Sequence, residues 1–200
     1  MRPEAAVFGG ILTHVRSLIS SFFAKDAGRP ESDHMLDSGT IPNHEFEGLA
    51  VAYWLMKSEP DAYSIDDLER DGTEPWDGIR NYQARNMMRD DMKIGDDVLF
   101  YHSSCKVPAV AGLAKVASAP YPDPTQFDPR AKYFDEKSGE ENPRWILVDI
   151  AYVRKMKRPI TLKELKDHPA LADFRLNQRG NRLSIFPVDK QHWDVVLSLE

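Results

Sequence analysis

Residues 76–86 read WDGIRNYQARN, and this stretch sets an aromatic side chain next to an Asp-Gly turn and several planar hydrogen-bond donors. The face of Trp76 can stack on any nucleobase, which is worth about 1–3 kcal/mol per base. Arginine and asparagine side chains such as those of Arg80 and Asn81 can read the edges of a base. The stretch therefore predicts one wall of a site for a flat polar ligand, of which a nucleobase is the leading example.

Short strands and short helices alternate on both sides of this stretch. Asn81 is a suitable N-cap for a helix that runs to residue 91, and Ser64 with Asp67 has the pattern of a capping box for an earlier helix. Further helices are expected at 161–166 and 189–199, and strands at 50–57, 97–102, 109–117, 145–155 and 183–186. Residues 120–143 are rich in proline and are expected to form a loop. Mixed elements without a βαβ rhythm predict an α+β fold with a barrel core.

Three more motifs flank the stretch: YWLMKSEP at 53–60, FYHS at 100–103, and RLSI at 182–185 followed by Pro187-Val188. With these four motifs in this order, residues 51–200 resemble the EVE domain family of the PUA-like superfamily. The resemblance implies an α+β fold consisting of a PUA-like β-barrel with short peripheral helices. It also implies a role in reading modified bases of nucleic acids.

The first fifty residues lie outside this resemblance. Apolar residues between Val7 and Phe23 fall on one helical face, so an amphipathic helix followed by a flexible linker is expected over 1–49, and the EVE domain over 50–200. His14 and Arg16 interrupt the apolar run, so no stable membrane insertion is expected. An interfacial membrane helix, a helix that docks on the domain or on a partner, a targeting peptide and an extension from an upstream start codon remain alternatives.

Composition places the chain among globular proteins, with 42% hydrophobic and 29% charged residues. Cys105 is its single cysteine, which excludes an internal disulfide framework and a cysteine-based zinc site and favours the reducing cytoplasm. The net charge of -6 argues against wrapping a duplex. Residues 153–182, however, hold 9 basic and 3 acidic side chains, which predicts a basic patch that contacts a short segment or a single flipped nucleotide. A solvated helix face is the alternative.

The candidate site residues come from all four motifs. Trp76 either stacks on the base or belongs to the core. Trp54 lies in the middle of a strand, and its side chain can face either side of that strand. Lys57 is suited to a phosphate and Glu59 to an exocyclic amine, unless a turn after the strand uses them. Asn81 is a candidate both for ligand contact and for the helix cap. The complete set is Trp54, Lys57, Ser58, Glu59, Trp76, Arg80, Asn81, His102, Ser103, Arg182 and Ser184.

The resemblance implies that the polar end of the FYHS motif, His102 with Ser103, approaches the ligand. It also implies that Arg182 and Ser184 close the pocket from the opposite side. Many EVE domains carry an asparagine after this serine, whereas this chain has Ser104. An amide contact from this loop is therefore not expected. For Arg182 the alternative is an exposed arginine on a packing strand.

Nothing in the sequence predicts catalysis. The chain has no phosphate-cradling glycine loop, dinucleotide fingerprint, nucleophile elbow or regularly spaced metal ligands, so no catalytic residue, metal or cofactor is expected. We expect a non-catalytic reader that binds a methylated or oxidised base of DNA or RNA in an aromatic pocket. A nucleic-acid-processing enzyme on a PUA-like scaffold is one alternative. A protein-interaction module that uses the N-terminal amphipathic helix as its partner contact is the other.

Overall fold

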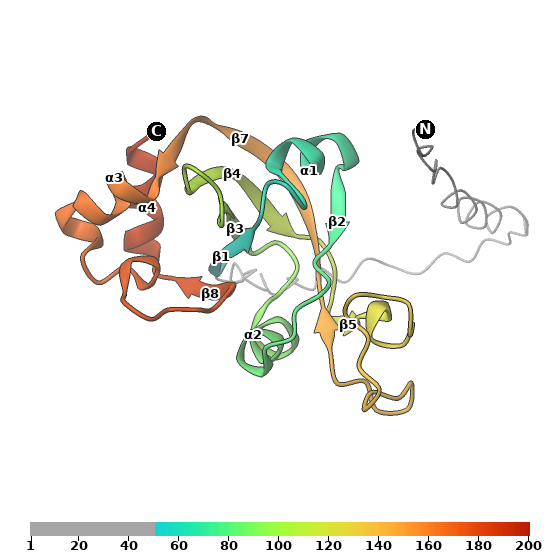
Figure 1. Cartoon of the computed structure of the whole chain (residues 1–200). Helices are drawn as coiled ribbons and strands as arrows, with labels where there is room; N and C mark the ends of the chain where they lie inside the picture. Colours follow the sequence, from blue (N-terminus) through green and yellow to red (C-terminus); the bar gives the residue numbers. More distant parts are fainter. Residues whose placement is uncertain (1–50) are drawn as a thin grey trace, which may run out of the picture. The chain divides into compact units, whose positions relative to one another are not determined.

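The computed structural model describes residues 51–200 (Figure 1), so the amphipathic helix and linker expected over 1–49 lie outside the described residues. Six strands form one sheet in the order β2-β7-β4-β3-β1-β8. They are β1 (Tyr53–Ser58), β2 (Thr73–Pro75), β3 (Asp97–His102), β4 (Ala109–Val116), β7 (Asp149–Thr161) and β8 (Ile185–Val188). A separate ladder joins β5 (Tyr121–Pro122) to β6 (Ile146–Leu147).

The six-stranded sheet curls into half a barrel, with β2 and β8 as its edges (Figure 1). β1 pairs with β3 in parallel, and the other neighbouring strands of this sheet pair antiparallel. Shifts of register along β4, where it pairs with β3 and with β7, add to the bend. The expected α+β class, with a barrel-like sheet and short helices, is confirmed.

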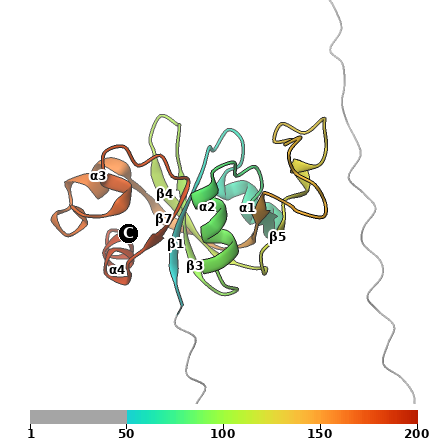
Figure 2. The ribbon, with the colours of Figure 1, turned by 90° about the horizontal axis from the view of Figure 1, so that it is seen from below.

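Both faces of the central strands are buried, because other elements cover each side of the sheet (Figure 2). Alternate residues of β1 divide between two core clusters: Trp54 and Met56 join one, and Leu55 joins the other. Residues of α1 (Ile65–Asp71) and α2 (Tyr82–Asn86) belong to the first cluster, and residues of α3 (Leu162–Asp167) and α4 (Lys190–Ser198) to the second. This double burial explains why these strands are continuously apolar in the sequence.

Side-chain caps fix where the helices begin, as the sequence predicts. The Ser64 N–H donates to Asp67 Oδ2 at 2.8 Å, and Ser64 Oγ accepts the Asp67 N–H at 3.2 Å, which completes a capping box for α1. A second capping box begins α3. Asn81 Oδ1 accepts the Ala84 N–H at 3.0 Å and caps α2, which continues as a π-helical turn over Met87–Asp91. No helix among residues 51–200 has the length and apolar composition needed to cross a membrane.

Several strands differ from the expectation. The strand expected over 145–155 is divided into β6 and β7, and β5 lies within residues 120–143, which were expected to form a loop. β7 continues to Thr161, beyond the expected strand, because it pairs with β4 along most of its length. β2 was not expected, because its three residues include Glu74 and Pro75, which are uncommon in strands. These residues form a strand because they pair with β7. β8 begins at Ile185 rather than at Leu183. Short 3₁₀ turns cover Pro124–Gln126, Pro169–Leu171 and Arg175–Asn177.

A buried carboxylate ties the start of β1 to the turn before β3. Asp96 is 4% exposed, and its Oδ1 accepts the Ala52 N–H at 3.1 Å. Its Oδ2 accepts the Trp54 indole N–H and the Lys93 N–H, each at 2.9 Å. These charge-assisted hydrogen bonds offset the cost of burying the carboxylate. They also explain why Trp54 faces the core, since its indole nitrogen finds its partner there.

The close approach of β4 to α1 depends on Gly112. A Cβ atom at Gly112 would come 2.5 Å from Ile65 Cδ1 and 2.9 Å from the Arg154 carbonyl oxygen. Because the backbone oxygen cannot move aside easily, Gly112→Ala should lower the free energy of unfolding by about 1–3 kcal/mol. Gly139→Ala is the matched control, since a Cβ atom there meets nothing within 4 Å. Urea denaturation followed by circular dichroism measures both, and equal stability of the two variants would contradict this packing.

Candidate functional site

Three strand ends converge at one side of the sheet. We call this side, where strands begin and end, the edge of the sheet, as distinct from the edge strands β2 and β8. In the parallel pair, Ser58 lies opposite His102, so β1 and β3 end side by side. The Ser103 N–H donates to the Ser58 carbonyl oxygen at 2.7 Å, which extends the pairing beyond β3. The Lys57 N–H donates to the Ser184 carbonyl oxygen at 2.8 Å, which brings the residue before β8 to the same edge. The structure thus brings five predicted site residues together: Lys57, Ser58, His102, Ser103 and Ser184.

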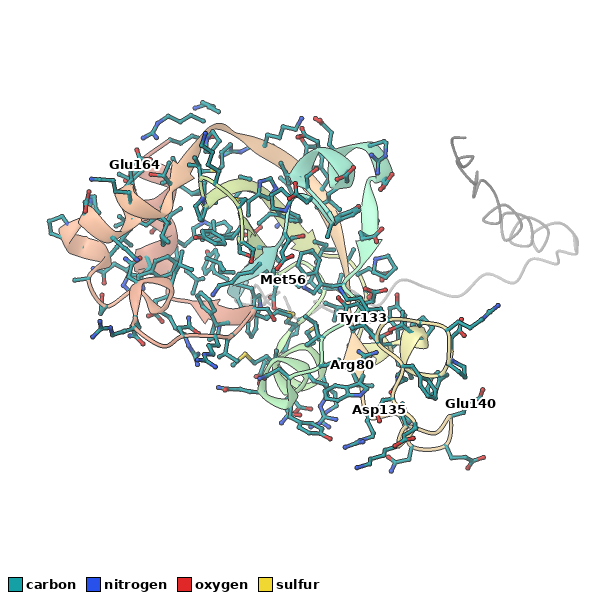
Figure 3. All side chains as sticks on the ribbon, in the orientation of Figure 1. Met56, Arg80, Tyr133, Asp135, Glu140 and Glu164 are labelled. Carbon is teal, nitrogen blue, oxygen red and sulfur yellow. The ribbon has the colours of Figure 1, made fainter. Side chains whose placement is uncertain are left out.

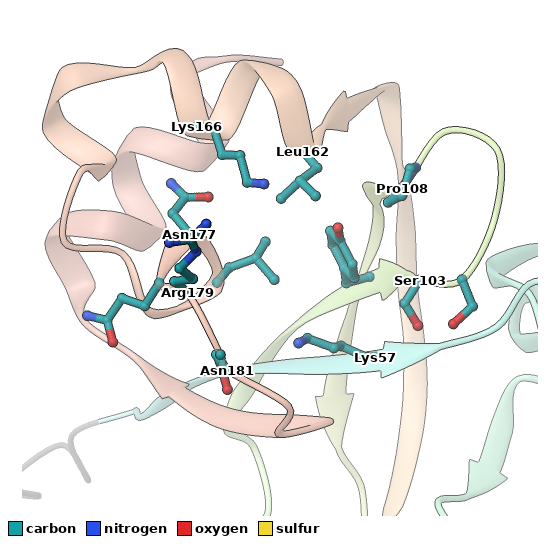
Figure 4. A pocket seen from close by; sticks show the side chains of 13 residues that line it. Lys57, Ser103, Pro108, Leu162, Lys166, Asn177, Arg179 and Asn181 are labelled. Atoms are coloured by element: carbon teal, nitrogen blue, oxygen red, sulfur yellow. The ribbon is translucent and has the colours of Figure 1, made fainter.

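A cavity of about 670 Å³ opens beside this edge. Lys57 points into it from β1, and Lys166 points into it from α3 on the opposite side (Figure 4). Its aromatic member is Tyr101, and burial, with a further contribution from Cys105, raises the pKa of Tyr101 to about 12. The lining comprises Lys57, Tyr101, Ser103, Ser104, Pro108, Leu162, Lys166, Leu176, Asn177, Gln178, Arg179, Gly180 and Asn181.

A second cavity, of about 420 Å³, adjoins the first and reaches the start of α2. It is lined by Asn81, Gln83, Arg175, Gln178, Arg179, Gly180, Asn181, Arg182 and Leu183. The two cavities share the loop of residues 178–181, so one ligand can extend across both. We call the two cavities together the basic cleft.

Among residues 51–200, five basic side chains line the basic cleft and no carboxylate does. They are Lys57, Lys166, Arg175, Arg179 and Arg182, and none of them forms an ion pair with the residues that the structure describes. Four other basic side chains of 153–182 are neutralised: Arg154 by Glu200, Lys155 by Asp66 and Glu69, Arg158 by Glu164, and Lys163 by Asp167. Apart from the exposed Lys157, the unpaired basic residues of 153–182 therefore lie in the cleft, where they attract an anionic ligand.

Two of these cations share an aromatic neighbour. The Lys57 ammonium group lies 5.4 Å from the centre of the Phe186 ring, and the Arg175 guanidinium carbon lies 5.8 Å from the same centre. Burial lowers the pKa of Lys57, because its ammonium group is partly desolvated, and no carboxylate of the described residues pairs with it. A phosphate group beside Lys57 would supply the missing countercharge.

Amide hydrogen bonds hold the 178–181 loop in place. Asn177 Nδ2 donates to carbonyl oxygens of α3 and of the following 3₁₀ turn, both at 2.8 Å. Asn181 Nδ2 donates to the Arg175 carbonyl oxygen at 2.9 Å, and Asn181 Oδ1 accepts the Leu183 N–H at 3.1 Å. Gly180 has a φ of 83°, a conformation that favours glycine. The backbone that presents Arg179 to both cavities is therefore fixed by its own neighbours.

The two candidate tryptophans are core residues. Trp54 is 3% exposed and Trp76 is 7% exposed, and neither lines the basic cleft. Trp76 meets Phe100 edge to face with ring centres 5.6 Å apart, and its backbone N–H donates to the Val148 carbonyl oxygen at 2.9 Å. The core alternative therefore describes both side chains in this structure. Stacking on a base stays a prediction that requires these rings to move.

Arg80 forms hydrogen bonds with residues 123–145, the segment between β5 and β6 that we call the excursion (Figure 3). Its guanidinium donates to Asp123 Oδ2 at 2.7 Å, to Thr125 Oγ1 at 3.0 Å and to the Tyr133 carbonyl oxygen at 2.9 Å. Burial alone would raise the pKa of Asp123, but hydrogen bonds from Arg80, Thr125 and a backbone N–H outweigh it and lower that pKa. Arg80 thus organises this excursion, and its direct contact with a ligand stays a prediction.

The remaining candidates divide between the cleft and a turn near it. Asn81 caps α2 and also lines the smaller cavity, as does Arg182 with its exposed side chain. Ser58 Oγ donates to the Tyr63 carbonyl oxygen at 2.5 Å, and the Glu59 carbonyl oxygen accepts the Tyr63 N–H at 2.9 Å. Ser58 and Glu59 therefore build the turn after β1, and the exposed Glu59 side chain lines neither cavity.

Sequence reasoning missed most of the 175–181 segment and one face of α3. Lys166, Arg175 and Arg179 belong to the basic excess of 153–182, which could have identified them individually. Tyr101 and the amide side chains carry no such signal, because only the fold places them beside the strand ends. No group of three or more His, Cys, Asp and Glu side chains among residues 51–200 could hold a metal ion.

Comparison with known proteins identifies relatives over the same region. The EVE domain family matches residues 52–199. Human thymocyte nuclear protein 1 is 46% identical over 167 residues, which cover 74% of this chain and 74% of the relative.

Solved structures share the fold. An X-ray structure of a Pseudomonas putida protein matches with a TM-score of 0.72 and 48% identity, covering 74% of this chain and 99% of the other. The crystal structure of human THYN1 in complex with DNA that contains 5-methylcytosine matches with a TM-score of 0.70 and 44% identity, covering 74% of this chain and 96% of the other. The shared fold thus includes the domain that carries the basic cleft.

His102 links the cleft edge to α1 through a hydrogen bond that needs the neutral imidazole. Its Nε2 accepts the Ile65 N–H at 3.1 Å, and burial lowers the pKa of His102. The unfolded chain therefore binds this proton more readily than the folded chain. The free energy of unfolding should keep its full value above about pH 6.5 and fall as the pH decreases below it.

His102→Gln retains an acceptor but cannot titrate, so it should flatten this pH dependence. Urea denaturation of both proteins at a series of pH values from about 8 to about 5 measures the difference. An identical loss of stability in the two proteins at low pH would show that His102 is not responsible.

Proposed function

This chain belongs to the EVE domain family, and on that premise we propose that it is a non-catalytic reader that binds a modified base of a nucleic acid in the basic cleft. The observation that carries the proposal is the set of five cations around two adjoining cavities, which form no ion pair and meet no carboxylate of the lining among residues 51–200. The human relative THYN1 was crystallised with DNA that contains 5-methylcytosine, which supports the same class of ligand here. The proposal covers methylated and oxidised bases of DNA or RNA.

We assign the base, together with a phosphate beside Lys57 and Lys166, to the larger cavity and the adjoining backbone to the smaller one. Tyr101 provides an aromatic wall, and Ser103 and Gln178 offer hydrogen-bonding groups to the base edges. Arg179 and Arg182 are placed to meet phosphate oxygens, which positions the strand without reading its sequence. This division gives the cleft a base-reading end and a backbone-binding end.

Four residues predicted from the sequence take direct roles in this arrangement: Lys57, Asn81, Ser103 and Arg182. The others are proposed to shape the strand ends, the turn and the excursion around it: Trp54, Ser58, Glu59, Trp76, Arg80, His102 and Ser184. An aromatic pocket built on Trp76 stays a prediction, because that ring would have to leave its contact with Phe100.

Packing around a methyl group contributes only modestly to selectivity for the modified base. Burying one CH₂-sized group is worth about 0.8 kcal/mol, which corresponds to less than a tenfold preference. Stronger discrimination requires a second contribution, such as easier unstacking of the modified base before it enters the cleft.

The lining of the cleft favours binding over turnover. Within the described part of the chain, no histidine, cysteine or carboxylate lines either cavity, and these groups most often act as general bases and nucleophiles. The lowered pKa of Lys57, which shares the larger cavity with Ser103, is the observation that favours a nucleic-acid-processing enzyme instead. Turnover of an oligonucleotide that Lys57→Met abolishes would establish that alternative.

Two further expectations rest on features beyond the cleft. The protein-interaction module depends on residues 1–49, which lie outside the described part, and deleting them would separate partner binding from base binding. A cytoplasmic location stays a prediction for this chain, whereas the human relative carries a nuclear designation in its name.

The reader function predicts unequal binding of matched oligonucleotides. We expect the 200-residue chain to bind a strand with one 5-methylcytosine at least about fourfold more tightly than the same strand with cytosine, from the added methyl group. Fluorescence anisotropy with labelled DNA and RNA strands measures this ratio, and methylated adenine and oxidised cytosine extend the series. Equal affinity for every member of the series would rule out modified-base reading.

Two lysines of α3 provide a matched test of the phosphate contacts. Lys166 lines the larger cavity, whereas Lys163 lies outside the cleft and pairs with Asp167 at 2.5 Å. Lys166→Gln should weaken binding to all sequences alike and reduce the slope of log K against log salt by about 0.7–0.9. Lys163→Gln should leave affinity and slope unchanged, and indistinguishable slopes for the two variants would contradict a phosphate at Lys166.

A further inference from the structure

A second polar surface lies on α2, outside the basic cleft. Tyr82 is 47% exposed, and its ring stacks on Trp145 with centres 4.9 Å apart and planes inclined by 25°. The guanidinium carbon of Arg85 lies 5.0 Å from the centre of the Tyr82 ring, and that of Arg144 lies 5.7 Å from it. We call Tyr82, Arg85 and Arg144, together with the buried Trp145, the Tyr82 surface.

This surface carries positive charge beside an exposed aromatic ring. Arg85 forms no ion pair with the described residues, and its guanidinium donates to the Arg144 carbonyl oxygen at 2.5 Å. Burial lowers the pKa of Arg85, and the neighbouring Arg89 and Arg144 contribute to the same shift. Arg144 pairs with Asp135 at 3.1 Å, and its second amine contacts the Tyr82 hydroxyl group. The guanidinium groups of Arg85 and Arg144 lie over the ring, so a base can stack on the planar guanidinium groups and the exposed part of the ring while its phosphate meets their charge.

The Tyr82 surface and the basic cleft meet at α2. Asn81 and Gln83, the neighbours of Tyr82 in the sequence, line the smaller cavity. α2 lies between the segment that leads into β8 and the excursion around β5 (Figure 1), and the view from below shows it between α3 and β5 (Figure 2). A strand of nucleic acid that leaves the cleft over Asn81 and Gln83 therefore runs along α2, the helix that carries Tyr82.

Packing alone does not account for the exposure of Tyr82. Trp145 is 6% exposed, and Asp135 Oδ2 accepts its indole N–H at 2.8 Å. The Arg80 guanidinium carbon lies 5.3 Å from the centre of the Trp145 ring. Trp145 is thus held by other residues, and a tyrosine that served packing only would gain free energy from being covered as well.

We propose that the Tyr82 surface binds the nucleotide next to the base held in the basic cleft, with the flanking base stacked at Tyr82 and its phosphate near Arg85 and Arg144. The inference rests on the proposed function, because it needs a nucleic acid in the cleft. It defines the ligand as a polymer with at least one unstacked flanking nucleotide, rather than a free nucleotide. Stacking tolerates any base, so this surface adds affinity without adding sequence preference.

Two ligands separate this surface from the cleft: single-stranded DNA of about nine nucleotides with one central 5-methylcytosine, and the monophosphate of 5-methyl-2′-deoxycytidine. In the 200-residue chain, Tyr82→Leu should weaken binding of the strand about 5- to 150-fold and leave binding of the mononucleotide unchanged. Tyr82→Phe keeps the ring and should retain the affinity for the strand. Arg85→Gln should reduce the salt slope for the strand by about 0.7 and leave the mononucleotide unaffected.

Thermal unfolding of each variant shows whether it is folded. If Tyr82→Leu does not fold, the comparison is made with Arg85→Gln instead. Unchanged strand binding in the variants, or an equal loss for both ligands, would overturn the inference. If the parent protein binds methylated and unmethylated strands alike, modified-base reading fails. The Tyr82 comparison still decides the inference in that case, because the unmethylated strand carries the same flanking bases. If the parent protein binds no strand at all, both the proposed function and the inference about the Tyr82 surface are overturned.

Discussion

The parallel pairing of β1 with β3 is the constraint on which the rest of the structure depends. Parallel strands end at the same edge of a sheet, so Ser58 and His102 become neighbours although they lie far apart in the sequence. The antiparallel strands on either side, β8 and β4, begin at that same edge and bring their preceding loops to it. A wholly antiparallel sheet would divide these segments between its two ends. This one parallel pair therefore gathers the polar groups of four strands into a single site.

An acidic chain, with a net charge of -6, still presents a concentrated positive surface, through arrangement rather than composition. Several basic side chains away from the cleft pair with carboxylates, as Arg154 does with Glu200 and Lys163 with Asp167. Those that line the cleft have no such partner among the described residues. Exposed ion pairs contribute only about 0–1 kcal/mol each to stability, so their clearer effect is to reduce the positive potential over other parts of the surface.

Local elements could be predicted because their signals are local. The capping side chains of Ser64, Asn81 and Thr161 mark the helix starts that the structure shows. The burial of Trp76 could not be predicted in this way, because it follows a turn-like Glu-Pro step and is buried through contacts with distant strands. The cleft could likewise be predicted only in part. The sequence identified the strand ends beside it, but the amides of residues 177–181 acquire their neighbours only when α3 packs beside them.

Arg80 reaches the excursion between β5 and β6 at Asp123, Tyr133 and Trp145. Residues 139–142, between the last two of these anchor points, are all exposed. Evolution, or a protein engineer, can therefore lengthen or exchange this tip while the sheet and its core stay as they are. Because the same excursion presents Arg144 next to Tyr82, such exchanges offer a route by which one constant domain acquires new binding preferences.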